Sequence, residues 1–332
     1  MALLEVRELS TSFFTQRGII PAVRGVSFDV ERGETLGIVG ESGSGKSVTA
    51  YSVMQILSPG GKITGGSVKL SGVELIGLRE EKMREIRGGR IAIIFQDPMT
   101  SLNPTLTVGF QLAEAISLHT DKKGAEARRR AAELLELVNI SDPERRMKQY
   151  PHELSGGMRQ RVMIAMALSS EPDVLIADEP TTALDVTIQA QILSLMKELQ
   201  RALGMAIIMI THDLGVIAET CDRVLVMYAG KVCEGGRTDD IFYNPRHEYT
   251  KGLLRSVPRV SSIGKPLVPI GGTPVDLTHI PEGCPFVPRC PEAMRICKMR
   301  FPDTTYHGGE HFANCFVNQK ERMIKGGDGD AE

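Results

Sequence analysis

The chain has 332 residues, which is enough for one large domain and a smaller one. Its formal net charge is −2 with acidic and basic residues mixed, so no electrostatic surface for nucleic acid and no nucleic-acid partner are expected. No apolar stretch reaches the ~20 residues that span a bilayer, and the N-terminus does not have the pattern of a secretory signal. We therefore expect a soluble chain.

The first hundred residues contain a nucleotide-binding pattern. Residues 3–35 alternate apolar and polar positions, which predicts antiparallel strands. The apolar run Thr35–Val39 predicts a buried strand, and Val48–Leu57 has a helical pattern. Between them, Gly40–Ser47 fits the phosphate-loop pattern G-x-x-x-x-G-K-[ST], and the strand before it and the helix after it are the context that this pattern requires.

The chemistry of this loop suits a nucleoside triphosphate. Its glycines let backbone N–H groups turn inward as an anion-binding nest, and the helix N-terminus adds partial positive charge. Lys46 is expected to reach the β and γ phosphates, and the Ser47 hydroxyl to ligate Mg²⁺. The candidate ATP-binding residues here are Gly40, Ser42, Gly43, Ser44, Gly45, Lys46, Ser47 and Val48.

The middle of the chain is expected to be mostly helical, over roughly residues 98–170. Just before it, the strand pattern Ile91–Ile94 leads to Phe95-Gln96-Asp97-Pro98, where Gln96 is a neutral ligand for both Mg²⁺ and water. Helices are predicted over Gly109–Leu118, Lys123–Asn139 and Arg161–Ser169. The basic run at 128–130 is interpreted as a solvated helix face.

Leu154–Gln160 has a serine and paired glycines before a helix, which makes it a second phosphate-ready helix N-terminus. One chain rarely needs two such sites for one nucleotide. Further along, the buried-strand pattern Val174–Ala177 ends in Asp178 and Glu179. We expect Asp178 to hold Mg²⁺ and Glu179 to polarise the attacking water. A helix is predicted over Val186–Leu203, and a strand over Ala206–Ile210 that ends at His212.

These motifs resemble, in order and spacing, those of ATP-binding cassette (ABC) ATPases over roughly residues 3–255. The resemblance implies a phosphate loop at Gly40–Ser47, a Q-loop at Gln96, a Walker B acid and catalytic base at Asp178 and Glu179, and a switch residue at His212. It also implies a signature sequence and a D-loop, carried by Ser155, Gly156, Gly157 and Asp185. Phe13, or its neighbour Phe14, is implied as the aromatic residue that stacks on adenine.

The resemblance also implies why two phosphate-ready sites occur. In this family two ATPase domains pack head to tail, and each nucleotide lies between one phosphate loop and the partner's signature. Ser155, Gly156 and Gly157 would then contact ATP held mainly by the partner. ATP would favour closure of the dimer and hydrolysis would release it.

The composition changes after about residue 256, where closely spaced prolines leave room for few helices or strands. Clustered cysteines and phenylalanines nevertheless favour a small stapled module over a disordered tail. Cys284, Cys290, Cys297 and Cys315 are spaced C-x5-C-x6-C-x17-C. Disulfides do not suit a reducing cytosol, and the short C-x2–4-C pair of structural zinc sites is absent. An iron–sulfur cluster is favoured, with zinc, no metal, or ligation by His279, His307 or His311 left open. The module is expected to be separate from the ATP site.

The segments 244–254 and 284–291, together with 95–104, resemble oligopeptide and dipeptide importer ATPases, of the D-subunit type. Some members of that group carry a [4Fe–4S] cluster on such cysteines. The resemblance implies a peripheral location on the cytoplasmic face of the membrane, ATP and Mg²⁺ as cofactors, and two permease subunits as partners. It further implies a homologous second ATPase subunit, with an identical one left open, and an extracytoplasmic peptide-binding protein.

We thus expect an α/β ABC-type P-loop core with an antiparallel β subdomain and a helical insert (residues 1–255), plus a small Cys-rich extension (256–332). The expected activity is ATP hydrolysis that drives import of di- or oligopeptides. Cargo such as nickel, a sugar or an antibiotic peptide stays open, as do a non-transport ABC ATPase and a redox- or iron-sensing role for the extension.

Overall fold

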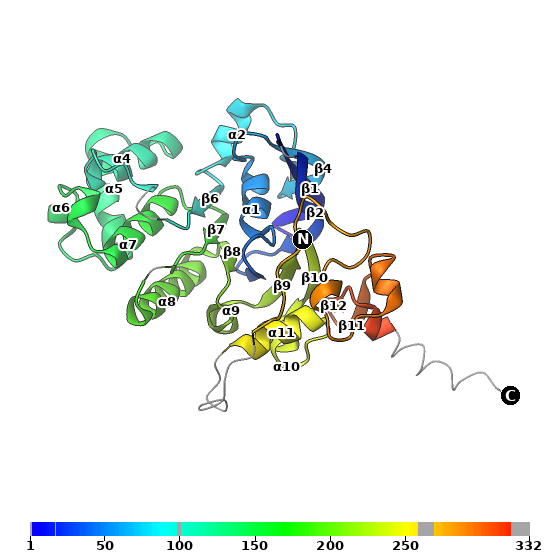
Figure 1. The fold of residues 1–332 in the computed structure, drawn as a ribbon. Helices are drawn as coiled ribbons and strands as arrows, with labels where there is room; N and C mark the ends of the chain where they lie inside the picture. Colours follow the sequence, from blue (N-terminus) through cyan, green and yellow to red (C-terminus); the bar gives the residue numbers. More distant parts are fainter. Residues whose placement is uncertain (1, 17, 98–100, 183, 258–268, 320–332) are drawn as a thin grey trace. The chain divides into compact units, whose positions relative to one another are not determined.

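The computed structural model describes residues 2–16, 18–97, 101–182, 184–257 and 269–319 (Figure 1). The chain divides into two compact units, each assembled from segments that are distant in sequence. The first unit contains Met1–Glu5, Asp29–Thr35 and Val68–Ile210. The second contains Val6–Phe28, Leu36–Ser67 and Thr211–Glu332.

The first unit is built on three parallel strands. These are β6 (Ile91–Ile94), β7 (Val174–Asp178) and β8 (Ala206–Thr211), with β7 in the middle. Every residue of β7 and β8 is buried, as expected of short apolar runs in a covered parallel sheet. The register places Asp178 opposite Ile210, so the acidic pair Asp178-Glu179 leaves the sheet at the carboxyl end of the central strand.

The start of β7 is held by a charged cluster. Asp173 accepts a hydrogen bond from Arg32 at 2.5 Å and from Arg90 at 2.7 Å. Burial works against the charged form of Asp173, but the two arginines outweigh burial and lower the pKa of this carboxyl. The strand carrying the acidic pair is therefore fixed at its other end.

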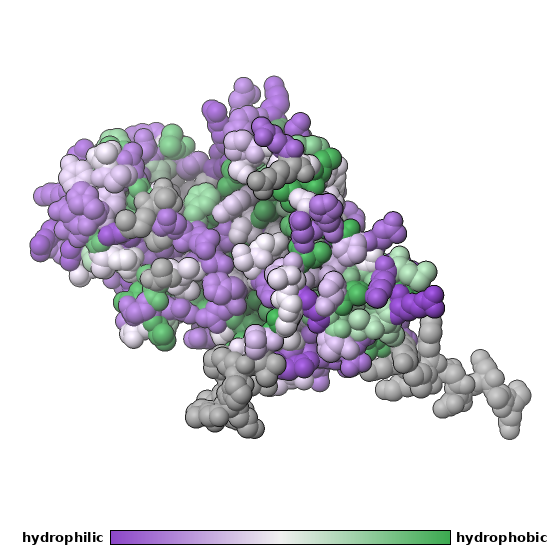
Figure 2. Space-filling view, in the orientation of Figure 1, coloured by the Kyte–Doolittle hydropathy of each residue, from purple (hydrophilic) through white to green (hydrophobic). Residues whose placement is uncertain are grey.

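A helical insert follows β6 in the same unit. It contains α4 (Val108–His119), α5 (Gly124–Leu137), α6 (Pro143–Arg146), the short 3₁₀ helix η1 (Pro151–Glu153) and α7 (Gly156–Ala167). Helices α4, α5 and α7 pack on one another, and the side chains that they bury include Leu112, Ile116, Leu134 and Ile164. The side chains visible over α4–α6 in Figure 2 are mainly hydrophilic. The first expected residues of this insert, 98–100, lie outside the described residues.

Helix α7 begins five positions before the predicted Arg161, because Ser155 caps it. Helix α8 (Val186–Leu203) has the predicted bounds; Asp185 caps its start, and Gly204 ends it with φ 63°. The apolar residues of α8 that recur at helical spacing are buried at Ile192, Leu195, Met196 and Leu199, whereas Leu203 is exposed. A short strand β5 (Val73–Glu74) and helix α2 (Glu80–Ile86) complete the unit.

The second unit contains the phosphate loop. Strand β3 (Thr35–Val39) pairs in parallel with β9 (Arg223–Tyr228), which pairs antiparallel with β10 (Lys231–Arg237). Strands β2 (Gly18–Val30), β1 (Leu4–Thr15) and β4 (Gly61–Leu70) are neighbours, in that order, in another sheet. The helices are α1 (Lys46–Met54), α9 (Leu214–Thr220), α10 (Thr238–Tyr243) and α11 (Glu248–Ser256).

The C-terminal segment adds to this unit. Besides two 3₁₀ helices, η3 (Val287–Arg289) and η4 (Arg295–Lys298), it forms a hairpin of β11 (Thr305–Gly308) and β12 (His311–Ala313). Strand β12 pairs antiparallel with β10, so the hairpin extends the sheet that carries the phosphate loop (Figure 1). The expected extension at 256–332 includes 258–268 and 320–332, which lie outside the described residues.

Among the helices of the described residues, none is both long enough and apolar enough to cross a bilayer.

Candidate functional site

The phosphate loop connects β3 to α1 in a way that only glycine permits at two points. A side chain at Gly40 would place its Cβ 2.3 Å from the carbonyl oxygen of Met227. Gly45, the residue before α1, has φ 101°, and a Cβ there would lie 2.5 Å from the carbonyl oxygen of Ala22. The backbone of the phosphate loop can therefore lie this close to Met227 and Ala22 only with glycine at positions 40 and 45.

The loop has the donors that an anion requires. Gly45, the N-cap of α1, makes no side-chain capping hydrogen bond, and a helix N-terminus of this kind favours an anion. The Ser44 hydroxyl is buried and has no hydrogen-bond partner among the residues that the structure describes. Lys46, which is also buried, donates to the carbonyl oxygens of Gly40 at 2.8 Å and Glu41 at 3.1 Å. A phosphate group would supply the acceptor that the Ser44 hydroxyl needs, and it would suit the partial positive charge at the helix N-terminus, so these residues fit ATP.

In the first unit, the carboxyl ends of β6 and β7 bring three predicted site residues together. Asp178 is the last residue of β7 and is 0% exposed. Glu179 follows it with φ 49°, a conformation that is strained for a residue with a side chain and is often found at functional sites. Its Oε2 accepts hydrogen bonds from Gln96 Nε2 and from Thr182 Oγ1, both at 2.9 Å.

The signature and D-loop residues lie at two neighbouring helix N-termini of the first unit. The Ser155 hydroxyl accepts from Met158 N at 3.4 Å, and Asp185 Oδ1 accepts from Ile188 N at 2.9 Å. A Cβ at Gly157 would lie 2.7 Å from Ile188 Cγ2, so this glycine allows α7 and α8 to pack closely. Ser155, Gly156 and Asp185 are exposed and accessible to a partner.

The remaining residues predicted for the ATP site lie in the second unit. Phe13 is half-buried, and its ring lies so close to Gly61 that a Cβ there would be 2.8 Å from Cε1. Phe14 is 48% exposed and lies under the Lys62 ammonium, 5.6 Å from its ring centre. His212 is exposed just after β8.

The four tail cysteines line one cavity, together with Phe286 and His247. Burial raises the pKa of Cys284 to about 12 and of Cys290 to about 11, and it also raises that of Cys315. Of the alternative ligands, His311 is engaged with Glu234 at 2.9 Å. The described residues contain no group of three or more His, Cys, Asp or Glu that could hold a metal ion, so the metal expectation gains no support there.

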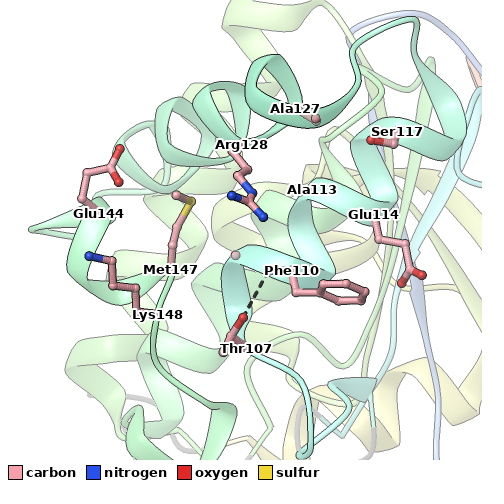
Figure 3. A pocket seen from close by; sticks show the side chains of 12 residues that line it. Thr107, Phe110, Ala113, Glu114, Ser117, Ala127, Arg128, Glu144, Met147 and Lys148 are labelled. Carbon is pink, nitrogen blue, oxygen red and sulfur yellow. Dashed lines mark hydrogen bonds between the residues drawn. The ribbon is translucent and has the colours of Figure 1, made fainter.

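Sequence reasoning missed two features. One is a hollow of about 650 Å³ in the helical insert, lined by α4 and α5 and by Met147 and Lys148 (Figure 3). Phe110, which is 53% exposed, and Arg128 point into it. Arg128 belongs to the basic run that was interpreted as a solvated face. The other is Arg289, whose guanidinium binds the carboxylate of Glu41 in the phosphate loop, although the sequence indicated a separate module.

Comparisons with known proteins agree with this geometry. A family model described as ABC transporter matches residues 23–182. The chain is 55% identical over 329 residues to the dipeptide transport ATP-binding protein DppD of Bacillus subtilis (strain 168), covering 98% of each chain. The chain belongs to the ABC transporter family. A second model, the C-terminal region of oligopeptide/dipeptide transporters, matches residues 233–297 of this ABC transporter protein.

Further relatives extend the comparison. The ABC chain is 53% identical over 321 residues to the oligopeptide transport ATP-binding protein OppD of Salmonella typhimurium, covering 97% of this chain and 95% of that one. Among solved structures, a dimeric ATP-binding cassette in a post-hydrolysis state, bound to ADP and Pi, matches with a TM-score of 0.64 and 29% identity, over 71% of this chain and 98% of that one. The expected family and its α/β ATPase fold are thus confirmed.

Proposed function

We propose that this chain is the ATP-hydrolysing motor subunit of an importer for dipeptides or oligopeptides. The observation that carries the proposal is a glycine-shaped phosphate loop at the N-terminus of α1, with a buried Ser44 hydroxyl that has no hydrogen-bond partner among the described residues, on a chain whose relatives are named for peptide transport. The reaction is ATP + H₂O → ADP + phosphate.

In this proposal each site residue has one task. Lys46 and the N–H groups of α1 bind the phosphates, while Ser47, Gln96 and Asp178 are the Mg²⁺ ligands or hold its waters. Bound Mg²⁺ would neutralise charge on the phosphates. Glu179 accepts the proton of the water that attacks the γ-phosphorus as the bond to the leaving oxygen of ADP breaks. The hydrogen bonds from Gln96 and Thr182 orient this carboxylate. His212 would contact the γ-phosphate, and Phe13 or Phe14 the adenine.

The active site would be completed by a second ATPase subunit. Support comes from the exposed signature residues Ser155 and Gly156, and from the dimeric ATP-binding cassette with ADP and Pi that this chain resembles. Gly157 would also contact the partner's ATP, and Asp185 would connect the two sites. A homologous partner and a second copy of this chain both fit this arrangement.

The hollow in the helical insert would receive a short helix of a permease subunit. Its lining includes the exposed phenyl ring of Phe110, apolar Met147, and cationic Arg128 and Lys148 (Figure 3). Because Glu114 and Glu144 line the hollow beside the two cations, an amphipathic helix end with charges of both signs matches these walls. This contact would hold the chain on the cytoplasmic face of the membrane, with the extracytoplasmic peptide-binding protein on the other side.

The cysteine cavity would hold a [4Fe–4S] cluster, with Zn²⁺ as the alternative. Support for a metal comes from four thiols that line one cavity although burial disfavours their ionisation, since a bound metal cation stabilises thiolates. Cys284, Cys290, Cys297 and Cys315 would hold the cluster through their thiolates, and the cluster would stabilise the fold of the C-terminal segment.

Deletion of the coding sequence tests the proposed cargo. Uptake of a radiolabelled dipeptide should fall to background and return with the wild-type chain, but not with Glu179→Gln. Nickel and sugar uptake are the matched controls. Loss of either of these, with peptide uptake intact, would reassign the cargo to the alternatives. No change in any uptake would favour a non-transport ABC ATPase.

A further inference from the structure

The phosphate loop is bound to the C-terminal segment by a two-pronged ion pair. Arg289 Nη1 donates to Glu41 Oε2 at 2.6 Å, and Nη2 donates to Glu41 Oε1 at 2.9 Å. The Arg289 side chain is only 3% exposed, and that of Glu41 is 28% exposed. A bidentate arginine–carboxylate pair in this setting fixes orientation as well as charge.

The same guanidinium is anchored on its other edges. Its Nε donates to the carbonyl oxygen of Gly271 at 2.9 Å, and Nη2 also lies 3.3 Å from that of Ile270. Nη1 lies 3.4 Å from the Tyr228 hydroxyl on β9. These acceptors fix the position of the Arg289 guanidinium independently of Glu41. Arg289 can therefore hold the Glu41 carboxylate in one orientation.

The backbone of Glu41 is bound from the C-terminal side as well. Glu41 N donates to the hydroxyl of Tyr249 on α11 at 2.7 Å, and burial raises the pKa of this hydroxyl, which keeps it neutral. The Tyr249 ring packs against Tyr228 and Phe286. In addition, Pro274, Val275 and Leu277 line a small cavity with the loop residues 41–44. The first half of the phosphate loop is therefore in contact with residues that come after the last ATPase motif in the sequence.

The charge of Glu41 gives this contact a consequence for nucleotide binding. A carboxylate inside a phosphate-binding loop repels a triphosphate, and since the Glu41 side chain is 28% exposed, water screens this repulsion only in part. The Arg289 guanidinium offsets this charge, and its two hydrogen bonds hold the Glu41 side chain in place. Without it, the same carboxylate would be free to compete with phosphate for Lys46 and the loop N–H groups.

We propose that Arg289 is a positioning residue for ATP: by neutralising and orienting Glu41, it holds the phosphate loop ready for nucleotide. This rests on the proposed function, since it assumes that Gly40–Ser47 binds ATP. It goes beyond it by making the C-terminal segment a determinant of ATP affinity.

Equilibrium binding of MgATP to the full chain tests the proposal. Arg289→Met keeps an apolar stem but removes the fork, and we expect the Kd to rise about 10-fold or more, the effect of exposing an unpaired charge. Arg295→Met is the matched control, because it removes the same charge from an exposed site in the same segment, and its Kd should stay within about twofold. Thermal unfolding of each variant reports whether the segment stays folded.

The double variant Glu41→Gln/Arg289→Met separates this role from a general effect on folding. If Arg289 acts through Glu41, removing the carboxylate should recover most of the lost affinity, to within about threefold of wild type. A double variant as weak as Arg289→Met overturns the proposal, as does an Arg289→Met Kd within twofold of wild type. Should Arg289→Met unfold, Arg289→Gln decides, because it removes the charge but keeps a polar group that can donate hydrogen bonds. Wild-type affinity of Arg289→Gln overturns the proposal.

Failure of the proposed function gives a different result. In that case the wild-type chain itself would not bind MgATP. Binding by wild type with no effect of Arg289→Met would overturn only the positioning role.

Discussion

Replacing Glu179 by glutamine is the sharpest test of the hydrolytic mechanism. The substitution keeps the shape of the side chain, and an amide oxygen can still accept from Gln96 Nε2 and Thr182 Oγ1, each of which lies 2.9 Å from Oε2 in the wild-type chain. Hydrogen bonds to a neutral acceptor are roughly half as strong as those to a carboxylate, so the local loss is about 1–2 kcal/mol. That loss does not unfold a domain of this size.

The loss of proton acceptance should be much larger. General-base catalysis contributes about 10²–10⁴-fold, which corresponds to roughly 3–5.5 kcal/mol in the activation barrier. Glu179→Gln should therefore reduce phosphate release by at least about 100-fold, while the Kd for MgATP stays within about threefold of wild type. Single-turnover phosphate release, followed beside equilibrium nucleotide binding, measures both quantities.

Thr182→Val is the matched control for Glu179→Gln. It removes one of the two donors with almost no change in volume but leaves the carboxylate, so a loss of only about 10-fold is expected. Phosphate release by Glu179→Gln at more than a tenth of the wild-type rate would refute the assignment of Glu179 as the base. Equal losses in the two variants would show that orientation, and not proton acceptance, is the contribution of Glu179.

Three further predictions concern other parts of the chain. Lys46→Ala should weaken MgATP binding to the isolated chain. Ser155→Arg should leave that binding within about threefold of wild type and abolish hydrolysis in the dimer. Equal loss of binding in the two variants would argue against an ATP site that two subunits share. Anaerobically purified protein should absorb near ~400 nm and contain about four iron atoms per chain, and Cys290→Ser should lose both; stoichiometric zinc without iron would exclude the cluster. Asp173→Asn should lower the free energy of unfolding by about 1 kcal/mol at pH 7 after solvent screening. Because folding lowers the pKa of Asp173, the difference in free energy of unfolding between the two chains should persist above pH 3.8 and disappear as the pH falls through the folded pKa. Urea unfolding at several pH values measures it, and a pH-independent difference would contradict the prediction.

The parts of the fold that the sequence predicted are those encoded locally. The phosphate loop and strands β3, β6, β7 and β8 could be predicted because glycine spacing and short apolar runs are contiguous patterns. The full length of α8 was predicted because its apolar residues recur at helical spacing; the structure adds that Asp185 caps its start and Gly204 ends it. The start of α7 was misplaced because capping by Ser155 was not weighed against the paired glycines, which are poor helix formers.

The features that the sequence did not predict depend on long-range contacts. Arg289 and Glu41 are 248 positions apart, and no local pattern marks either as a partner of the other. Likewise, Arg128 has the spacing of a solvated helix position, and only the packing of α4 beside α5 makes it line a hollow. Phe13 and Phe14 illustrate the same limit, because a single position in a strand changes which ring faces solvent.

The pairing of β12 with β10 has a consequence for any attempt to isolate the ATPase motifs. A chain cut after residue 257 would leave β10 as an open sheet edge, with unpaired backbone groups at Glu234 and Gly235, where Ala313 and Phe312 are now opposite. Open edges of this kind promote aggregation. The cut would also strip the fully buried Glu234 carboxylate of its contact with His311. The backbone N–H groups of Arg246 and His247 would still bind this carboxylate, so poor solubility of a shortened chain would mainly reflect the uncovered edge, and not a fault in nucleotide binding.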